Sequence, residues 1–494
     1  MSVNAIKSSP PEDSEPLTVV EKVGYGLGDT ASNLYWKLFE NFQLIFYTDV
    51  FGISAAAAAT MFFVTKLWDA INDPLIGLMA DRTRTAWGTF RPYLIWGSIP
   101  FAVSGILTFY CPDLSSQGKL VYAYITYTLV FMAYTFINIP YGALMGVISP
   151  SSLERTSVST YRFVLAFCGG LAVQKFTEPL VAYFGGTETR LIGGVETVVV
   201  LDKQTGFFWT VVCYALAAVV LFMITFATTK ERVVPEQKKN SAFRQDIWDL
   251  LRNRAWLVLL VVGLFQILAG WTRGSAIAYY FTYYVNSSFG NFLAVSTVSG
   301  IVGMLMTKRL TAIFGKKLLM ILMNLAVAVL TAMFVFLKSD QVVLMYAINI
   351  CLAFVGGPIP VLLWAMYADA ADYSEWRFHR RATGLVFSAA TFSQKLGGAL
   401  GAAVPGWMLS VYGFTAPIDG VQQVQSETTI DGIILMMSLV PAVFLVAAAI
   451  SLMFYNINEK LLHEIENDLR NRKSRAGSDE PQSDSTQESN QDIL

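Results

Sequence analysis

Two carboxylates lie one helical turn apart in an otherwise apolar part of the sequence. Residues 68–74 read WDAINDP and contain Asp69, Asn72 and Asp73, with Lys66 just upstream. If the segment is helical, residues four apart share a face, and two carboxylates at that spacing repel each other unless a positive charge lies between them. That charge is Lys66, a proton or a metal ion. Three polar side chains carrying oxygen within one turn favour a hard monovalent cation such as Na⁺.

A cation at this position needs one or two more oxygen ligands from a neighbouring helix. Thr135, in the run AYTFINIPYG, offers a hydroxyl group. The expected Na⁺ site therefore has four residues: Asp69, Asn72, Asp73 and Thr135. In the alternative, structural interpretation, the two aspartates pair with Lys66 and Arg162 and only lock helices together.

Further polar side chains interrupt the apolar segments. An ionisable group costs at least about 2.5–3.5 kcal/mol near the centre of a membrane, so each one is a candidate for function. The polar residues in these segments are Asn33, Lys37, Glu40, Asn41, Asn138, Arg162, Gln174, Lys175, Glu178, Gln266, Arg273, Gln394 and Lys395.

Some of these charges have a partner nearby in the sequence and others have none. Lys37 and Glu40 are spaced i,i+3 and can neutralise each other. Arg273 and Lys395 have no acid nearby in the sequence, so we expect them to point into a water-filled cavity. Trp271 stands beside Arg273. A flat apolar ring next to a hydrogen-bond donor suits a pyranose, whose C–H face stacks while its hydroxyl groups need polar partners.

The segments that carry these residues are long and apolar enough to cross a membrane. The chain has 494 residues, of which 54% are hydrophobic and only 14% are charged, whereas soluble proteins carry about 25% charged residues. A helix needs about 20 apolar residues to cross the hydrocarbon core. Such segments are expected near residues 25–51, 55–80, 92–111, 119–149, 158–184, 207–229, 256–286, 289–307, 318–337, 341–368, 383–412 and 431–456. The expected fold class is an all-α integral membrane protein with 12 transmembrane helices.

Lysine and arginine gather in every second connection. The connections after the even-numbered helices are basic, as in DRTRTAWGTFR and EWRFHRRAT, whereas NSSFGN and TAPIDGVQQVQSETTIDG contain neither residue. Because basic loops stay in the cytoplasm, both termini are expected there, in a multi-pass plasma membrane protein of the bacterial inner-membrane type. The N-terminus has no signal-peptide pattern. The tail from about residue 460 is expected to form a short amphipathic helix followed by disorder.

One pattern occurs twice. GLMADRTRTAWGTFR follows the second predicted helix and GMLMTKRLTAIFGKK follows the eighth, which predicts two six-helix pseudo-repeat halves. The expected parts are residues 1–21 (N-terminal segment), 22–229 (first half), 230–255 (central cytoplasmic loop), 256–456 (second half) and 457–494 (tail). In the first copy, Asp81, Arg82 and Arg91 are expected to form a gating contact, unless they only signal topology.

Other classes of function lack the residues that they need. The two histidines, His379 and His463, have no partner at metal-ligand spacing, so an enzyme is not expected and no catalytic residue is assigned. The four cysteines lie far apart in apolar runs and have no metal-binding pattern. The sequence has no nucleic-acid motif, and a net charge of −1 provides no polyanion-binding surface. Neither a channel filter repeat nor a signalling domain is present in the pattern.

Seven runs of the sequence resemble one transporter family. They are GYGLGDTASN, FYTDVFGIS, WDAINDPLIG, DRTRTAWGTFRPYLIWG, NIPYGAL, YADAADYSEW and QKLGGALG. In order and spacing they resemble, over about residues 20–460, the glycoside–pentoside–hexuronide:cation symporters, the melibiose permease-like branch of the major facilitator superfamily. The resemblance implies the major facilitator fold and a cation site at the four residues given above. It also implies that Arg162 lies on the sugar side and that Lys395 lies near the cation.

The resemblance breaks down at the sugar site. The positions that match the two sugar-binding aspartates of melibiose permease are Asn33 and Asn138, and Gly142 replaces an aromatic residue. Asparagine still hydrogen-bonds hydroxyl groups, but two negative charges are absent. A carboxylated sugar such as a uronide fits the more positive cavity, and a neutral glycoside fits equally if Glu40 and Glu178 cancel two of the positive charges. The expected substrate-binding residues are Asn33, Lys37, Asn138, Arg162, Trp271, Arg273 and Lys395.

The resemblance and the residues together predict a secondary active transporter. It would import a sugar, glycoside or hexuronide (or an oligosaccharide of these) with a coupling cation, Na⁺ in the first instance, by alternating access. Coupling to H⁺ or Li⁺ and a lysolipid-type carrier of the same fold are the alternatives. No cofactor other than the coupling cation is expected, and the partners are the substrate, that cation and the lipid bilayer. Each ligand should raise the affinity of the other.

Overall fold

The protein is mostly helical. The computed structural model describes residues 16–149, 152–192, 195–233, 251–378, 383–417 and 422–478. The first half contains α1 (Val19–Phe46) with η1 (Tyr47–Phe51), α2 (Ala55–Arg82), α3 (Pro92–Thr108), α4 (Ser116–Val147), α5 (Ser152–Gly185) and α6 (Lys203–Thr228). The second half contains α8 (Arg254–Tyr279) with η2 (Tyr280–Val285), α9 (Gly290–Leu305), α10 (Thr307–Phe314), α11 (Lys316–Ala332) with η3 (Met333–Phe336), α12 (Val342–Gly356), α13 (Pro358–Phe378), α14 (Thr383–Val411), α15 (Glu427–Met437) and α16 (Leu439–Met453).

Each of the twelve predicted spans coincides with a helix or with consecutive helices in the described residues. The span predicted near 341–368 is divided into α12 and α13, and the one near 431–456 into α15 and α16. By length and composition alone, seven helices of the described chain could cross a membrane, or eight if the bent pair α9–α10 forms one span. Helices α1 and α2, which carry the buried charges described below, are not in that set.

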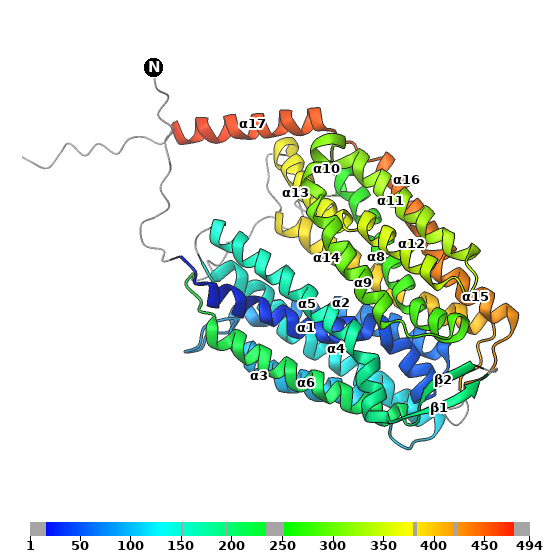
Figure 1. The fold of residues 1–494 in the computed structure, drawn as a ribbon. Coiled ribbons are helices and arrows are strands. Elements are labelled where there is room, and N and C mark those ends of the chain that lie inside the picture. Colours follow the sequence, from blue (N-terminus) through cyan, green and yellow to red (C-terminus); the bar gives the residue numbers. More distant parts are fainter. Residues whose placement is uncertain are drawn as a thin grey trace, which may run out of the picture.

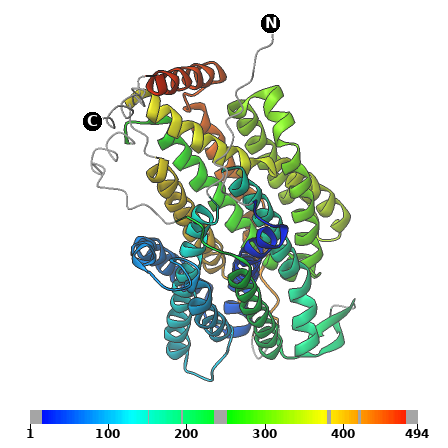
Figure 2. The same cartoon turned by 90° about the vertical axis from the view of Figure 1, so that its left-hand side faces the viewer.

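The two halves are arranged as a pair that meets at one end. In Figure 1 the helices of the first half lie below those of the second half, and the two sets converge toward η1, η2 and the β1–β2 hairpin and diverge toward α17. Figure 2 views the molecule from the side that carries α17. In the predicted orientation, the converging end faces outward and the diverging end faces the cytoplasm.

Glycines in α14 allow this helix to approach both halves. A Cβ atom on Gly397 would lie 2.6 Å from the carbonyl oxygen of Leu264 in α8, and one on Gly401 would lie 2.7 Å from Cβ of Trp271. On another side of α14, a Cβ on Gly406 would lie 2.5 Å from the carbonyl oxygen of Ala55 in α2. The run QKLGGALG therefore packs α14 between α8 and α2, and this position brings its lysine to the carboxylates of α2.

Two elements lie outside the helical spans. A hairpin of β1 (Thr187–Ile192) and β2 (Val195–Val200) connects α5 to α6 and was not part of the expected pattern. The predicted tail helix is present as α17 (Glu459–Ser478), whose buried Leu462 and Ile465 pack against the second half. Most of the predicted N-terminal segment, most of the central loop and the tail predicted to be disordered fall on residues 1–15, 234–250 and 479–494, outside the described residues.

Candidate functional site

The two carboxylates of α2, here called the acid pair, meet side chains from two other helices. Thr135 of α4 donates a hydrogen bond from its Oγ1 to Oδ1 of Asp69 at 2.6 Å and to Oδ1 of Asp73 at 3.3 Å. Lys395 of α14 places its Nζ 3.0 Å from Oδ2 of Asp69 and also contacts Asp73. An ammonium group therefore occupies the position between the carboxylates where charge repulsion predicts a cation.

Lys66 and Asn72 lie on the same helix but make other contacts. The Nζ of Lys66 lies 3.3 Å from the centroid of a Trp271 ring and donates to the carbonyl oxygen of Gly398 at 3.4 Å. Asn72 is buried, and its Nδ2 has no hydrogen-bond partner. The structure thus brings Asp69, Asp73 and Thr135 together, with Lys395 as their ion-pair partner and Lys66 stacked on an indole ring.

Arg162 of α5 pairs with an acid that was not among the expected site residues. Its Nε donates to Oδ2 of Asp29 at 2.8 Å, and its guanidinium group lies 5.1 Å from the centroid of the Tyr141 ring. Arg162 therefore does not pair with Asp69 or Asp73, and the alternative in which it locks α2 to another helix through these aspartates is wrong for Arg162. Asp29 lies in the run GYGLGDTASN, so its presence was visible, but its partner on α5 was not.

The two asparagines that replace acids of the related family differ in their surroundings. Asn33 donates from Nδ2 to the carbonyl oxygen of Asp29 at 2.9 Å and lines a cavity. Asn138 accepts a hydrogen bond from Ser32 at 3.1 Å through Oδ1 and donates to the carbonyl oxygen of Tyr134 at 3.2 Å. The oxygen and the nitrogen of the Asn138 side-chain amide are thus both engaged within the first half.

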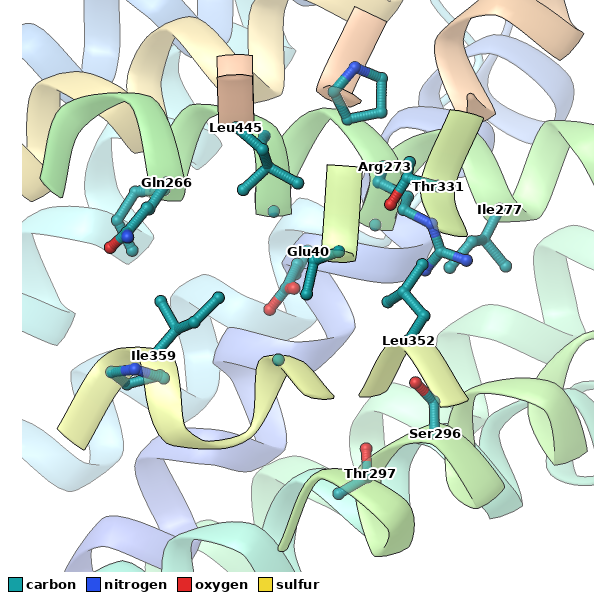
Figure 3. A pocket seen from close by; sticks show the side chains of 18 of the residues that line it. Glu40, Gln266, Arg273, Ile277, Ser296, Thr297, Thr331, Leu352, Ile359 and Leu445 are labelled. Carbon is teal, nitrogen blue, oxygen red and sulfur yellow. The ribbon is translucent and has the colours of Figure 1, made fainter. Parts of the chain in front are cut away.

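Two adjoining cavities lie between the halves. Their volumes are about 420 and 450 Å³, within the range of small-molecule sites. Seven residues line both: Lys37, Gln174, Ser296, Thr297, Leu352, Gly356 and Pro360. Figure 3 shows the first cavity, with Glu40, Gln266 and Arg273 around it. Of the expected substrate residues, Lys37 and Arg273 line the first cavity and Asn33 and Lys37 line the second, whereas four do not line either: Asn138, Arg162, Trp271 and Lys395.

The charged residues of the first cavity differ in pairing. Lys37 and Glu40 form an ion pair at 2.6 Å, as their spacing allowed. Arg273 donates from one terminal nitrogen to Oδ1 of Asn349 at 2.9 Å, and its Nε is buried without a hydrogen-bond partner. Asn349 was not identified from the sequence, because its hydrogen bond to Arg273 joins α12 to α8 across 76 residues of the chain.

The expected gating residues lie at the diverging end. The side chain of Asp81 falls outside the described side chains, and Arg82 is exposed. Arg91 donates to the carbonyl oxygen of Phe226 at 2.8 Å and lies over the ring of that residue. The carboxylate of Glu231, which sequence reasoning missed, accepts hydrogen bonds from three successive backbone N–H groups, those of residues 89–91.

The converging end is joined by side chains from both halves. Tyr283 of η2 donates to Asp49 of η1, and the hydroxyl groups of Thr48 and Tyr279 lie 2.6 Å apart. Glu178 of α5 accepts from the backbone N–H of Gly290 at 2.6 Å. The motif FYTDVFGIS contains Asp49, but nothing in the sequence pairs it with a tyrosine 234 residues later.

Comparison with known proteins gives consistent results. The profile of the family described as MFS/sugar transport protein matches residues 24–459. The chain is 36% identical over 455 residues to the putative glycoside/cation symporter YagG of Escherichia coli, covering 92% of this chain and 95% of the relative. It is 32% identical over 459 residues to the glucuronide carrier protein homolog of Escherichia coli, covering 91% and 95%.

Among solved structures, the inward-open conformation of the xylose transporter XylE from E. coli superposes with a TM-score of 0.58. The alignment covers 91% of this chain and 98% of that chain at 15% identity. At this identity the likeness concerns the fold, which is that of the major facilitator transporters.

Proposed function

Because the chain belongs to the MFS/sugar transport protein family, and is therefore a membrane transporter rather than an enzyme, we propose that it carries a sugar or sugar derivative together with Na⁺. The observation that carries this proposal is the acid pair: two carboxylates and a hydroxyl group converge inside the protein, bridged to the second half by Lys395.

The coupling cation binds at the acid pair by replacing the ammonium group of Lys395. The carboxylates and the hydroxyl group of Thr135 supply hard oxygen ligands. Asn72 is buried on the same helix, one residue before Asp73, and its side-chain amide oxygen is a further candidate ligand. The ammonium group that the cation displaces belongs to α14, so cation binding changes the contact between the two halves.

The sugar binds in the cavities between the halves. Their walls come from α1 and α5 of the first half and from α8, α9, α11, α12, α13, α14 and α16 of the second half. A ligand that contacts both halves favours the states in which they close around it, and this differential affinity drives alternating access. At the diverging end, Arg91 and the backbone of residues 89–91, which donates to Glu231, would take part in closing the cytoplasmic side.

Uptake by proteoliposomes tests the proposal. Radiolabelled glycosides are supplied with an inward gradient of Na⁺, Li⁺ or H⁺, or with none. We expect Na⁺-driven accumulation in the wild-type protein and at least a tenfold loss, on the order of 1.4 kcal/mol, in Asp69→Asn and Asp73→Asn. Accumulation driven by the pH gradient alone would assign H⁺ as the coupling ion. Unchanged Na⁺ stimulation in both variants would remove the acid pair from the coupling site.

A further inference from the structure

The cations that lie near the two cavities and the acid pair have acidic neighbours, with one exception. Lys37 is paired with Glu40 at 2.6 Å, and Arg162 is paired with Asp29 at 2.8 Å. The acid pair faces Lys395, and Lys66 has Asp69 and Glu40 as its charged neighbours. Two carboxylates and two ammonium groups thus sum to zero in that cluster.

Arg273 is the exception within the described residues. It forms no ion pair with any described carboxylate, and Tyr280 is the titratable group that faces it. Its guanidinium group lies 5.2 Å from the centroid of the Phe334 ring and donates one hydrogen bond, to Asn349. Removing a guanidinium ion from water without a negative partner is costly, because neither a ring face nor a neutral amide restores the hydration energy.

The surroundings of Arg273 orient it toward the cavity. Asn349 donates from Nδ2 to the carbonyl oxygen of Phe292 at 3.2 Å, which fixes its Oδ1 toward Arg273. Arg273 lines the first cavity, where Figure 3 shows its side chain near Thr331, Ile277 and Leu352. One hydrogen bond to Asn349 leaves most of the five N–H donors of the guanidinium group available for a ligand.

We propose that Arg273 binds an anionic group of the transported sugar, so that the natural substrate is a sugar acid rather than a neutral glycoside. This inference rests on the proposed function and specifies its substrate class. A carboxylate is the planar acceptor that a guanidinium group recognises best, through two parallel hydrogen bonds. The sugar hydroxyl groups then face the remaining polar wall of the cavity, which includes Lys37, Gln174 and Gln266.

The position of Arg273 also connects the two ligands. Trp271, two residues earlier in α8, carries Lys66 on its ring beside the acid pair. One helix therefore contacts the bound anion on the cavity side and the cation cluster on its other side. A charged substrate would contact α8 in the second half and Lys37 in the first half. Closure of the two halves would then depend on both the substrate and the coupling cation.

Two matched pairs of probes test the proposal: methyl β-D-glucuronide with methyl β-D-glucoside, and methyl β-D-galacturonide with methyl β-D-galactoside. Binding is measured by thermal shift of the purified protein in Na⁺, and uptake is measured in proteoliposomes. In the wild-type protein we expect at least one acid to bind about tenfold or more tightly than its neutral partner, the difference that a charged hydrogen-bond pair provides.

Arg273→Gln should reduce the acid-to-neutral binding ratio by about tenfold or more. It should also raise the melting temperature of the ligand-free protein, since it removes an unpaired buried charge. Asn349→Asp places a carboxylate beside Arg273. This carboxylate competes with the acid group of the ligand, so the substitution should also reduce the acid-to-neutral binding ratio. Arg254→Gln is the matched control, because Arg254 is exposed at the start of the same helix; it should leave the ratio unchanged.

The binding and uptake measurements distinguish failure of the anion site at Arg273 from failure of the proposed cation-driven symport. If neutral glycosides bind as tightly as their acids, or if Arg273→Gln leaves the ratio unchanged, the anion site is overturned while cation-driven symport stands. If an acid binds through Arg273 but no cation gradient drives its accumulation, the anion site is supported and the proposed symport fails.

Discussion

At the scale of the residue, the acid pair shows how charge repulsion between neighbouring carboxylates is relieved by side chains from other helices. Asp69 and Asp73 lie on one face of α2 and would repel each other if unpaired. Thr135 donates to both, and Lys395 neutralises part of the charge from the opposite half. If Na⁺ binds at the acid pair, as proposed, it competes with the ammonium group of Lys395, and binding of Na⁺ would release Lys395.

Replacement of Lys395 tests this competition. Lys395→Gln leaves the two partly buried carboxylates without their ion-pair partner, so the sodium-free protein should lose about 1–3 kcal/mol of stability. Sodium should then stabilise the variant more than it stabilises the wild-type protein. Thermal unfolding in sodium and choline buffers of equal ionic strength measures both effects.

Lys308→Gln, at an exposed lysine of α10, serves as the control and should respond to sodium like the wild type. A Lys395→Gln variant with wild-type stability in choline and a wild-type sodium response would show that Lys395 does not occupy the cation site.

At the scale of the element, α14 decides whether the site forms. Its glycines permit close backbone contact with α8 and α2. Lys395 reaches the acid pair only because α14 lies between these two helices. Other helical glycines have no such neighbour: a Cβ on Gly146 of α4 would meet nothing within 4 Å. Glycine is therefore required for close packing in α14, whereas in α4 Gly146 leaves room for a side chain.

Alanine substitutions at these two glycines should differ in sign. Gly397→Ala places a methyl group 2.6 Å from the carbonyl oxygen of Leu264, and overpacking of this kind costs about 1–3 kcal/mol. Gly146→Ala should stabilise the protein by about 0.5–1 kcal/mol, since alanine is the better helix former. Melting temperatures in one detergent measure both, and a stabilised Gly397→Ala variant would contradict the packing described for α14.

At the scale of the molecule, the first helices of the two halves end alike and meet. Both α1 and α8 continue into a π-helical segment that stops at a left-handed residue, Gly52 or Asn286. Asp49 and Tyr283 each lie three residues before that stop and contact each other. Equivalent positions of the two halves thus join the converging end, which in the predicted orientation closes the outward side and leaves the protein inward-open.

Removal of this contact should shift the protein toward the outward-open state. Tyr283→Phe eliminates a hydrogen bond to a carboxylate, worth about 1.5–3 kcal/mol, and so changes the population ratio by about tenfold or more. Hydrogen exchange measured by mass spectrometry should rise in peptides that cover η1 and η2 and fall at the diverging ends of α2 and α13.

The neighbouring Tyr284 provides the control. Its hydroxyl group donates to the carbonyl oxygen of Leu337, within the second half, at 2.7 Å. Tyr284→Phe should leave the exchange at η1 unchanged. Equal effects of the two substitutions would mean that the contact between the halves does not set the conformational equilibrium.

The sequence alone determined those features that follow from local periodicity and composition. Apolar stretches of span length predicted twelve segments that coincide with helices of the described chain, and the spacing of Asp69 and Asp73 predicted a shared face. The pairing of Lys37 with Glu40 was also predictable, because both residues lie on one helix. These features depend on neighbours within a few residues of each other.

Only the tertiary structure decided which distant charges are partners. Lys395, not Lys66, forms ion pairs with the acid pair, and Arg162 pairs with Asp29. Arg273 donates to Asn349 and forms no ion pair with a described carboxylate. The physical reason is that a buried charge is stabilised by whichever group the packing of helices places within a few ångströms. That packing is set by close approaches such as those of the α14 glycines, and helical periodicity does not specify which helices approach one another.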